Sequence, residues 1–201
     1  MMVYVSGLVV NRDRLLLGFH RKCQAWLQPG GKITNRESIV TGFSRELEEE
    51  TGVSGFRIMP APCGVVAVCT DYSPDRFELV SWSTLRLHVP NIALMDNTTC
   101  PSPFLAVVNA ALVDLFFVAS VREPRVRLNP AEHEDLRWFS SHELAPPGIN
   151  DSLLLRVGPA VLSLVRQNGT YCEDSTNRIS GRLKPIPNRN PLLARCQPGL
   201  D

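Results

Sequence analysis

The sequence lacks the features that would assign it to a membrane protein, a nucleic-acid binder or a repeat protein. Its 201 residues contain no internal repeat and no apolar run of the length that a membrane helix needs. The apolar start at residues 3–10 is too short for a signal peptide, so we expect a strand there. A formal net charge of +1 argues against electrostatically driven binding of nucleic acids or membranes, and we expect neither as a partner.

Cysteine is present but follows no pattern of a disulfide framework or a zinc site. The six cysteines include no C-x-x-C pair, and their spacing matches no framework of small secreted domains. We interpret them as reduced thiols and expect a cytoplasmic protein.

Length and composition suit one domain with an appended segment. A hydrophobic content of 44% over 201 residues is enough for a sizeable core. The final stretch is rich in Asn, Arg, Pro and Gly and has few large apolar residues. We therefore predict a folded domain over residues 1–167 and a largely irregular tail over residues 168–201.

The first half of the chain contains several strand-like runs. Residues 3–10 and 15–19 form a predicted hairpin around a polar turn. Residues 56–70 and 77–89 contain further runs of strand composition, with a turn between them. We expect these runs to be strands of one sheet.

The second half adds a central strand and a final helix. Residues 111–121 are apolar enough for a central strand, in which the acid Asp114 is unusual; a hydrogen-bonded or strand-edge acid outweighs a catalytic role. Residues 90–103 are irregular and could be a specificity loop or a disordered insertion. The final helix is predicted over residues 152–167, with a kink or break at Pro159.

One segment, residues 38–50, carries strong helix signals. Thr34 and Glu37 have the spacing of a capping box, and Gly52 stands where a left-handed cap commonly ends a helix. Four residues form an apolar stripe at helical spacing: Ile39, Val40, Phe43 and Leu47.

Acidic residues crowd along the edge of this stripe. Three carboxylates share one face at positions i, i+3 and i+4, namely Glu46, Glu49 and Glu50. Like charges at this spacing repel, so a protein keeps them together mainly where a divalent cation compensates them. Arg45 can pair with Glu49 four residues later, whereas Glu37 and Glu48 fall on the opposite side as ordinary solvated charges.

The glycines, the arginine and the acids of this stretch follow one fixed pattern. It reads Gly31, five residues, Glu37, seven residues, then Arg45-Glu46-Leu47, any residue, Glu49-Glu50, any residue, Gly52 and Val53. At every fixed position the pattern is similar to the Nudix box, so the chain resembles the Nudix family over residues 1–167. The resemblance implies an α/β fold, with a mixed β-sheet sandwiched between helices.

The resemblance also implies a role for each residue of the box. Glu49 and Glu50 would be core ligands of Mg²⁺ or Mn²⁺, and Glu46 a ligand or the base that activates water. The backbone carbonyl of Gly31 would help to hold a metal ion, and Arg45 would orient the cluster.

A further carboxylate is expected outside the box. Residues 129–144 resemble the family's acidic loop followed by a Trp-containing strand, and there we favour Glu132 over Glu134 as a metal ligand or an activator of water. The general base stays open, because family members take it from the box helix or from a later loop.

Three residues are candidates for substrate contacts. Arg21 and Lys22 precede the Pro-Gly-Gly turn and could bind phosphate, although such residues are more often solvated. His20 beside them is expected to be structural. Asn150 resembles a residue that reads a purine edge, but capping of the last helix is its competing role and comes first.

The family resemblance implies hydrolysis of a nucleoside diphosphate linked to another group. The chain lacks the signatures of NADH-cleaving and coenzyme A-cleaving relatives, and Val68 and Cys69 stand where many ADP-ribose enzymes have proline. A nucleoside triphosphate is therefore the leading substrate, and ADP-ribose or a nucleotide sugar is the alternative. A nucleotide sensor without catalytic activity is the alternative of another functional class. For the assembly, we consider a homodimer.

Overall fold

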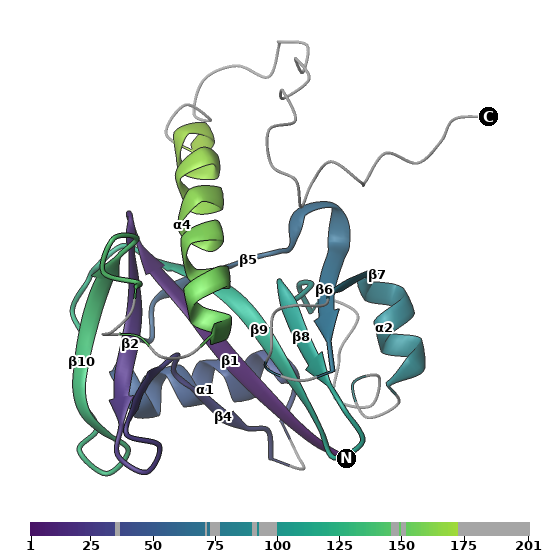
Figure 1. Cartoon of the computed structure of the whole chain (residues 1–201), viewed down its shortest axis with the longest axis horizontal. Coiled ribbons are helices and arrows are strands. Elements are labelled where there is room, and N and C mark those ends of the chain that lie inside the picture. The colour runs from purple at the N-terminus through teal and green to yellow at the C-terminus, as the bar shows by residue number, and fades with distance from the viewer. Residues whose placement is uncertain are drawn as a thin grey trace.

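The computed structural model of the chain describes these residues: 1–34, 37–70, 72, 77–89, 92, 100–145, 149 and 152–172. Within them, ten strands form one mixed sheet, whose main path runs β10-β2-β1-β9-β8-β6-β7 (Figure 1). The strands are β1 (Met2–Asn11), β2 (Arg14–His20), β3 (Ala25–Leu27), β4 (Gly30–Lys32), β5 (Phe56–Met59), β6 (Val65–Cys69), β7 (Glu78–Ser81), β8 (Leu105–Val108), β9 (Leu112–Val121) and β10 (His133–Ser140).

Strands β1 and β9 form the centre of the sheet. They are parallel, with a register that runs from Met2 beside Leu112 to Val10 beside Ser120. Strands β2 and β4 pair with β1 in antiparallel fashion, and β5 and β8 do the same with β9. The predicted hairpin and the predicted central strand are thus present, while the short strands β3, β4 and β8 were not expected.

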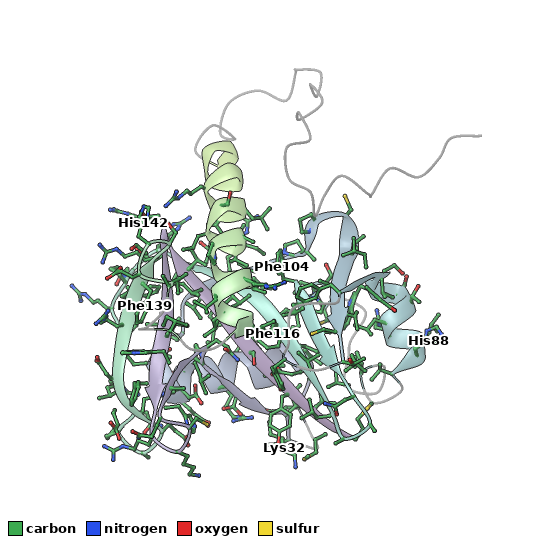
Figure 2. The ribbon with its side chains drawn as sticks, viewed as in Figure 1. Lys32, His88, Phe104, Phe116, Phe139 and His142 are labelled. Atoms are coloured by element: carbon green, nitrogen blue, oxygen red, sulfur yellow. The ribbon has the colours of Figure 1, made fainter. Side chains whose placement is uncertain are left out.

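Helices cover both faces of the sheet, as the predicted fold requires (Figure 1). Alternate residues of β1 point to opposite layers: Val5 packs with α1 (Ile39–Thr51) and α2 (Trp82–His88), whereas Leu8 packs with α4 (Ser152–Cys172). Phe116 and Phe139, labelled in Figure 2, are buried in the layer under α4. The prediction of a sheet sandwiched between helices is confirmed.

Helix α1 begins later than the capping box predicts. Its N-cap is Ser38, whose hydroxyl accepts from the Thr41 N–H at 3.2 Å. The predicted cap at Thr34 is wrong, although the Thr34 N–H does donate to Glu37 Oε1 at 2.7 Å. The predicted end is confirmed: Gly52 adopts φ 70°, and its N–H donates to the Glu48 carbonyl at 2.9 Å.

The run at residues 77–89 is only partly a strand. Strand β7 ends at Ser81, whose hydroxyl caps α2 by accepting from the Thr84 N–H at 3.1 Å. Trp82 and Leu85 are three residues apart, so they lie on the same face of α2, and both are buried. Packing of this helix face outweighs the strand-like composition of the segment. A short one-turn helix, η1 (Pro62–Gly64), likewise interrupts the run at residues 56–70.

Helix α4 continues through Pro159 to Cys172, so of the two predicted alternatives, a kink or a break, the break is wrong. Proline removes one helical hydrogen bond, but buried residues on both sides of it, Leu154 and Val161, hold the two halves against the sheet. The segment expected to be irregular from residue 168 therefore starts in a helix, and residues 173–201 lie outside the described part. Most of the loop expected at residues 90–103 also lies outside it.

None of the helices within the described residues is long and apolar enough to span a membrane.

Candidate active site

The two glycines before α1 lie directly against its carboxylates. The Gly30 N–H donates to Glu50 Oε2 at 3.0 Å. Gly30 has a φ of 156°, and a side chain there would collide with the backbone carbonyl of Val5. A methyl group at Gly31 would collide with the Glu46 carboxylate. Glycine is required at both positions because the backbone and its neighbours lie too close for a Cβ atom.

The three carboxylates differ in exposure as their helical positions predict. Glu50 is buried, with 7% of its surface exposed, Glu46 is half-buried, and Glu49 is exposed. Burial raises the pKa of Glu46, and the neighbouring charges of Glu50 and Glu49 raise it further, although Arg45 acts in the opposite direction. The carboxylate of Glu46 therefore sits where additional positive charge would be favourable.

Arg45 links the acids of this region. Its guanidinium contacts Glu46 Oε1 at 2.8 Å and Glu49 Oε2 at 3.0 Å, and it donates to the Lys32 carbonyl at 3.1 Å. The predicted pair with Glu49 is present, together with others that the helix spacing did not indicate. These contacts, with the strongest to Glu37, raise the pKa of Arg45 and keep it charged.

Glu37 is not the solvated charge that the helix pattern predicts. Its side chain is 10% exposed, and Arg45 donates to both of its carboxylate oxygens, at 2.7 and 3.1 Å. The hydrogen bond from Arg45 lowers the pKa of Glu37 to about 2. The prediction failed because α1 begins at Ile39, so Glu37 precedes the helix and does not follow its periodicity.

The acidic face of α1 carries suitable metal ligands, but in this structure their side chains do not converge on one position. Among the described residues, no three His, Cys, Asp or Glu side chains lie close enough together to hold an ion. Glu46 and Glu49 form ion pairs with Arg45, and Glu50 accepts a hydrogen bond from the Gly30 N–H. The donor set nevertheless fits a hard divalent cation, because Mg²⁺ and Mn²⁺ prefer carboxylate and carbonyl oxygens.

The predicted residues outside the box lie in the turn after β2, in or before β10, or outside the described residues. Arg21 and Lys22 are exposed in the turn between β2 and β3. The Arg21 N–H donates to the backbone carbonyl of Glu132 at 3.0 Å, so this turn adjoins the loop before β10, where the Glu132 side chain is exposed. Glu134 accepts from Gln24 at 3.4 Å. Asn150 lies outside the described residues.

The loop before β10 brings one side chain to the box helix, and it is a histidine. His133 is 1% exposed, and its Nε2 lies 3.2 Å from Glu50 Oε2. In this loop the sequence had predicted a role only for the acids on either side of His133, Glu132 and Glu134. The available signal was a histidine at the start of a strand in the segment that is expected to complete the site.

Asp114 is a buried, hydrogen-bonded acid, as predicted. It lies in β9 on the face toward α4 and is 5% exposed. The Ser6 hydroxyl donates to its two oxygens at 2.9 and 3.1 Å, and the Tyr72 hydroxyl donates at 3.1 Å. Burial raises the pKa of Asp114 to about 6, although both hydroxyls oppose the shift.

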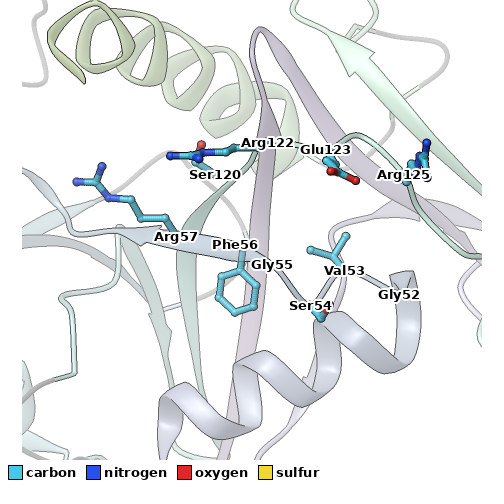
Figure 3. A pocket seen from close by; sticks show the side chains of 10 residues that line it. All are labelled: Gly52, Val53, Ser54, Gly55, Phe56, Arg57, Ser120, Arg122, Glu123 and Arg125. Atoms are coloured by element: carbon cyan, nitrogen blue, oxygen red, sulfur yellow. The ribbon is translucent and has the colours of Figure 1, made fainter. Parts of the chain in front are cut away.

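A cavity of about 650 Å³ lies at the C-terminal end of α1 (Figure 3). Residues 52–55 and Phe56 line it together with three arginines, Arg57, Arg122 and Arg125. Figure 3 shows Arg57 at one end of the cavity and Arg125 at the other, so the arginines do not converge on one position. None of the predicted site residues lines this cavity.

A mixed sheet between helices, with an acidic helix behind a glycine turn, is typical of hydrolases that cleave phosphoanhydride bonds. The chain belongs to the NUDIX domain family, whose family model matches residues 2–153. It is accordingly a Nudix hydrolase, and the prediction of an enzyme that cleaves a phosphoanhydride bond is confirmed at the level of the family. Members of the family generally use a divalent metal ion and act on small nucleotide substrates.

Solved structures agree with this fold at low sequence identity. A NUDIX family hydrolase from Clostridium perfringens is 19% identical, with a TM-score of 0.58 over 82% of this chain and 97% of its own. The NUDIX domain of Shewanella oneidensis NrtR, solved with ADP ribose, is 14% identical, with a TM-score of 0.50 over 82% of this chain and 88% of its own. No protein of curated function matches the chain.

Proposed function

We propose that this chain hydrolyses a nucleoside triphosphate to a nucleoside monophosphate and pyrophosphate, with Mg²⁺ or Mn²⁺. The observation that supports the proposal is the close packing of the glycine turn against Glu46 and Glu50. This packing places the carboxylate of Glu46 against the backbone of Gly31, and carboxylate and carbonyl oxygens are the ligands that hard divalent ions prefer.

The residues of the box, together with Glu132 from the loop before β10, have separate proposed roles. The metal ligands would be Gly31, Glu46, Glu49, Glu50 and Glu132. A divalent ion, when bound, supplies positive charge to the diphosphate and lowers the pKa of water. Arg45 orients Glu46 and Glu49 through direct ion pairs, and Glu46 is a candidate for the base because it is half-buried beside the glycine turn.

Preference for a triphosphate rests on the missing signatures of other substrates. Val68 and Cys69, where many ADP-ribose enzymes have proline, lie inside β6 and pair with Ala106 and Val107 of β8. A proline has no backbone N–H to donate to a strand ladder. Because neither position is a proline here, the pairing of β6 with β8 extends to Cys69. ADP-ribose or a nucleotide sugar is the alternative substrate.

Other parts of the proposal concern the surroundings of the site. Arg21 and Lys22 would contact phosphate from their exposed turn, and Asn150 would contact the base. The cytoplasmic location and the homodimer also stay predictions.

A panel of nucleotides tests the substrate. The purified chain is incubated with nucleoside triphosphates, ADP-ribose and nucleotide sugars in the presence of Mg²⁺ or Mn²⁺, and the products are identified. Release of pyrophosphate from a triphosphate is the expected result. Release of a sugar phosphate would replace the triphosphate by the alternative, and tight binding without any product over hours would favour a nucleotide sensor.

A further inference from the structure

We propose that His133 is a positioning residue, which holds Glu50 ready for the divalent ion; the inference rests on the proposed function. His133 Nε2 donates to Glu50 Oε2 at 3.2 Å, and the Gly30 N–H donates to the same oxygen at 3.0 Å. A carboxylate can only accept, so the proton of this bond lies on Nε2. Within the described residues, no hydrogen bond or ion pair uses Oε1 of Glu50, which leaves this oxygen for an ion.

The imidazole of His133 packs over the neighbouring strand β2, at a position where β2 has a glycine. The ring of His133 packs against Gly18 of β2, where a methyl group would collide with it. The ring of His20 meets it edge to face, with the ring centres 5.7 Å apart. Contacts on these two sides and nearly complete burial fix the orientation of the ring.

The two ring nitrogens of His133 differ in their hydrogen bonding. Nδ1 of His133 is buried and has no hydrogen-bond partner among the described groups. A histidine that only stabilised the core would be expected to satisfy both nitrogens. Here the described side-chain hydrogen bond of the imidazole goes to Glu50, so this bond is the one for which the buried ring is positioned.

A β-bulge aims His133 at the box helix. Asp135 pairs with Phe19 and His133 pairs with His20, so Glu134 is an extra residue in β10. Side chains alternate along a strand, and in a regular β10 His133 would share the face of Phe139, which packs in the α4 layer. The extra residue turns His133 to the α1 face instead.

Positioning through a hydrogen bond predicts a defined effect on metal binding. Groups that hydrogen-bond a ligating side chain change metal affinity by roughly 10-fold to 100-fold when they are removed. The described hydrogen bond of the His133 side chain goes to Glu50, so the effect of His133 should pass through Glu50. Loss of the bond should weaken ion binding even when no nucleotide is present.

Three variants of the full chain test this role, with Mn²⁺ alone as the probe. His133→Phe removes the donor but keeps a ring, and His133→Gln keeps an N–H near the position of Nε2. Gly18→Ala keeps the histidine but displaces its ring. His20→Phe is the matched control, because His20 also touches His133 but accepts from the Cys23 N–H instead of contacting Glu50.

Mn²⁺ affinity is measured by calorimetry, and folding by thermal unfolding in EDTA. We expect a loss of about 10-fold or more in affinity for His133→Phe and Gly18→Ala, recovery to within about threefold for His133→Gln, and no change for His20→Phe. If His133→Phe does not fold, the contrast between His133→Gln and Gly18→Ala decides in the same way. Wild-type affinity in folded His133→Phe, or in Gly18→Ala, would overturn the role of His133 and leave the proposed function standing. Failure of the wild-type chain to bind Mn²⁺ with or without nucleotide would overturn both.

Discussion

The two faces of the sheet hold acidic side chains in different ways. On the α1 face, Arg45 contacts Glu37, Glu46 and Glu49, and one edge of the group is open to solvent. On the α4 face, Asp114 lies inside β9 and is satisfied by the hydroxyls of Ser6 and Tyr72. The first arrangement concentrates negative charge that an ion can use, whereas the second makes the neutral form of a single acid more favourable.

Neutralising the box acids should have the largest effect of any change. We expect Glu49→Gln and Glu50→Gln each to lower metal-dependent turnover by about 100-fold or more while the fold is kept, because each removes a proposed ligand. Turnover with Mg²⁺ and circular dichroism are measured on the same preparations. Near-wild-type turnover with both substitutions combined would show that the acids of the α1 face are as structural as Asp114.

Asp114→Asn should stabilise the protein, and the sign follows from the raised pKa. A carboxyl whose pKa rises from 3.8 to about 6 on folding contributes stability below 3.8 and loses it as pH rises through 6. An amide avoids this loss, so we expect the variant to gain up to about 3 kcal/mol in unfolding free energy at pH 7.5, at 1.36 kcal/mol per pKa unit. Urea unfolding at pH 7.5 and pH 4 checks the prediction; a variant less stable than wild type at pH 7.5 would contradict it.

Arg45→Met should destabilise the protein in a pH-dependent manner. The lowered pKa of Glu37 means that its pairing with Arg45 contributes stability above pH 4.5 and loses it as the pH falls toward 2. The Arg45 side chain is 29% exposed, so we expect a loss of only about 1–2 kcal/mol at pH 7. Urea unfolding at pH 7 and pH 3 should show this difference shrinking in acid.

A matched control for this change is Arg166→Met. Arg166 Nη2 lies 3.6 Å from Asp13 Oδ2, and both side chains are 55% exposed. We expect a change of less than about 0.5 kcal/mol at both pH values. Equal losses for the two arginine variants would show that Arg45 is an ordinary surface charge.

Glu48→Gln should have the smallest effect. Glu48 lies on α1 between the box acids but is exposed on the opposite side of the helix. We expect unfolding free energy within about 0.5 kcal/mol of wild type and turnover within about twofold. A large loss of turnover would mean that the number of acids on the helix matters more than the face on which they lie.

Local patterns in the sequence predicted the parts of the molecule that depend on neighbouring residues. The end of α1 at Gly52 and the exposure of Glu46, Glu49 and Glu50 follow from helical periodicity and from the conformation that glycine allows. The buried state of Asp114 followed from its place in an apolar strand. Such features need no knowledge of the distant chain.

The errors occur where distant parts of the chain decide the structure. The exception is the contact of Glu37 with Arg45, eight residues away, which was missed because Glu37 precedes the start of α1. The helix α2, by contrast, depends on burial of Trp82. Packing of α4 on the sheet carries that helix through Pro159. The contact of His133 with Glu50 joins residues 83 positions apart, and no local pattern reports it.

The extra residue in β10 also determines what a shortened relative could do. Deleting Glu134 alone would restore regular alternation in β10 and turn the imidazole away from α1, without altering any of the proposed metal ligands. Such a chain would keep its box intact and its sheet paired, yet it would hold divalent ions poorly. If His133 positions Glu50 as proposed, one extra residue in β10 would thus set the affinity for divalent ions together with the acids of the box.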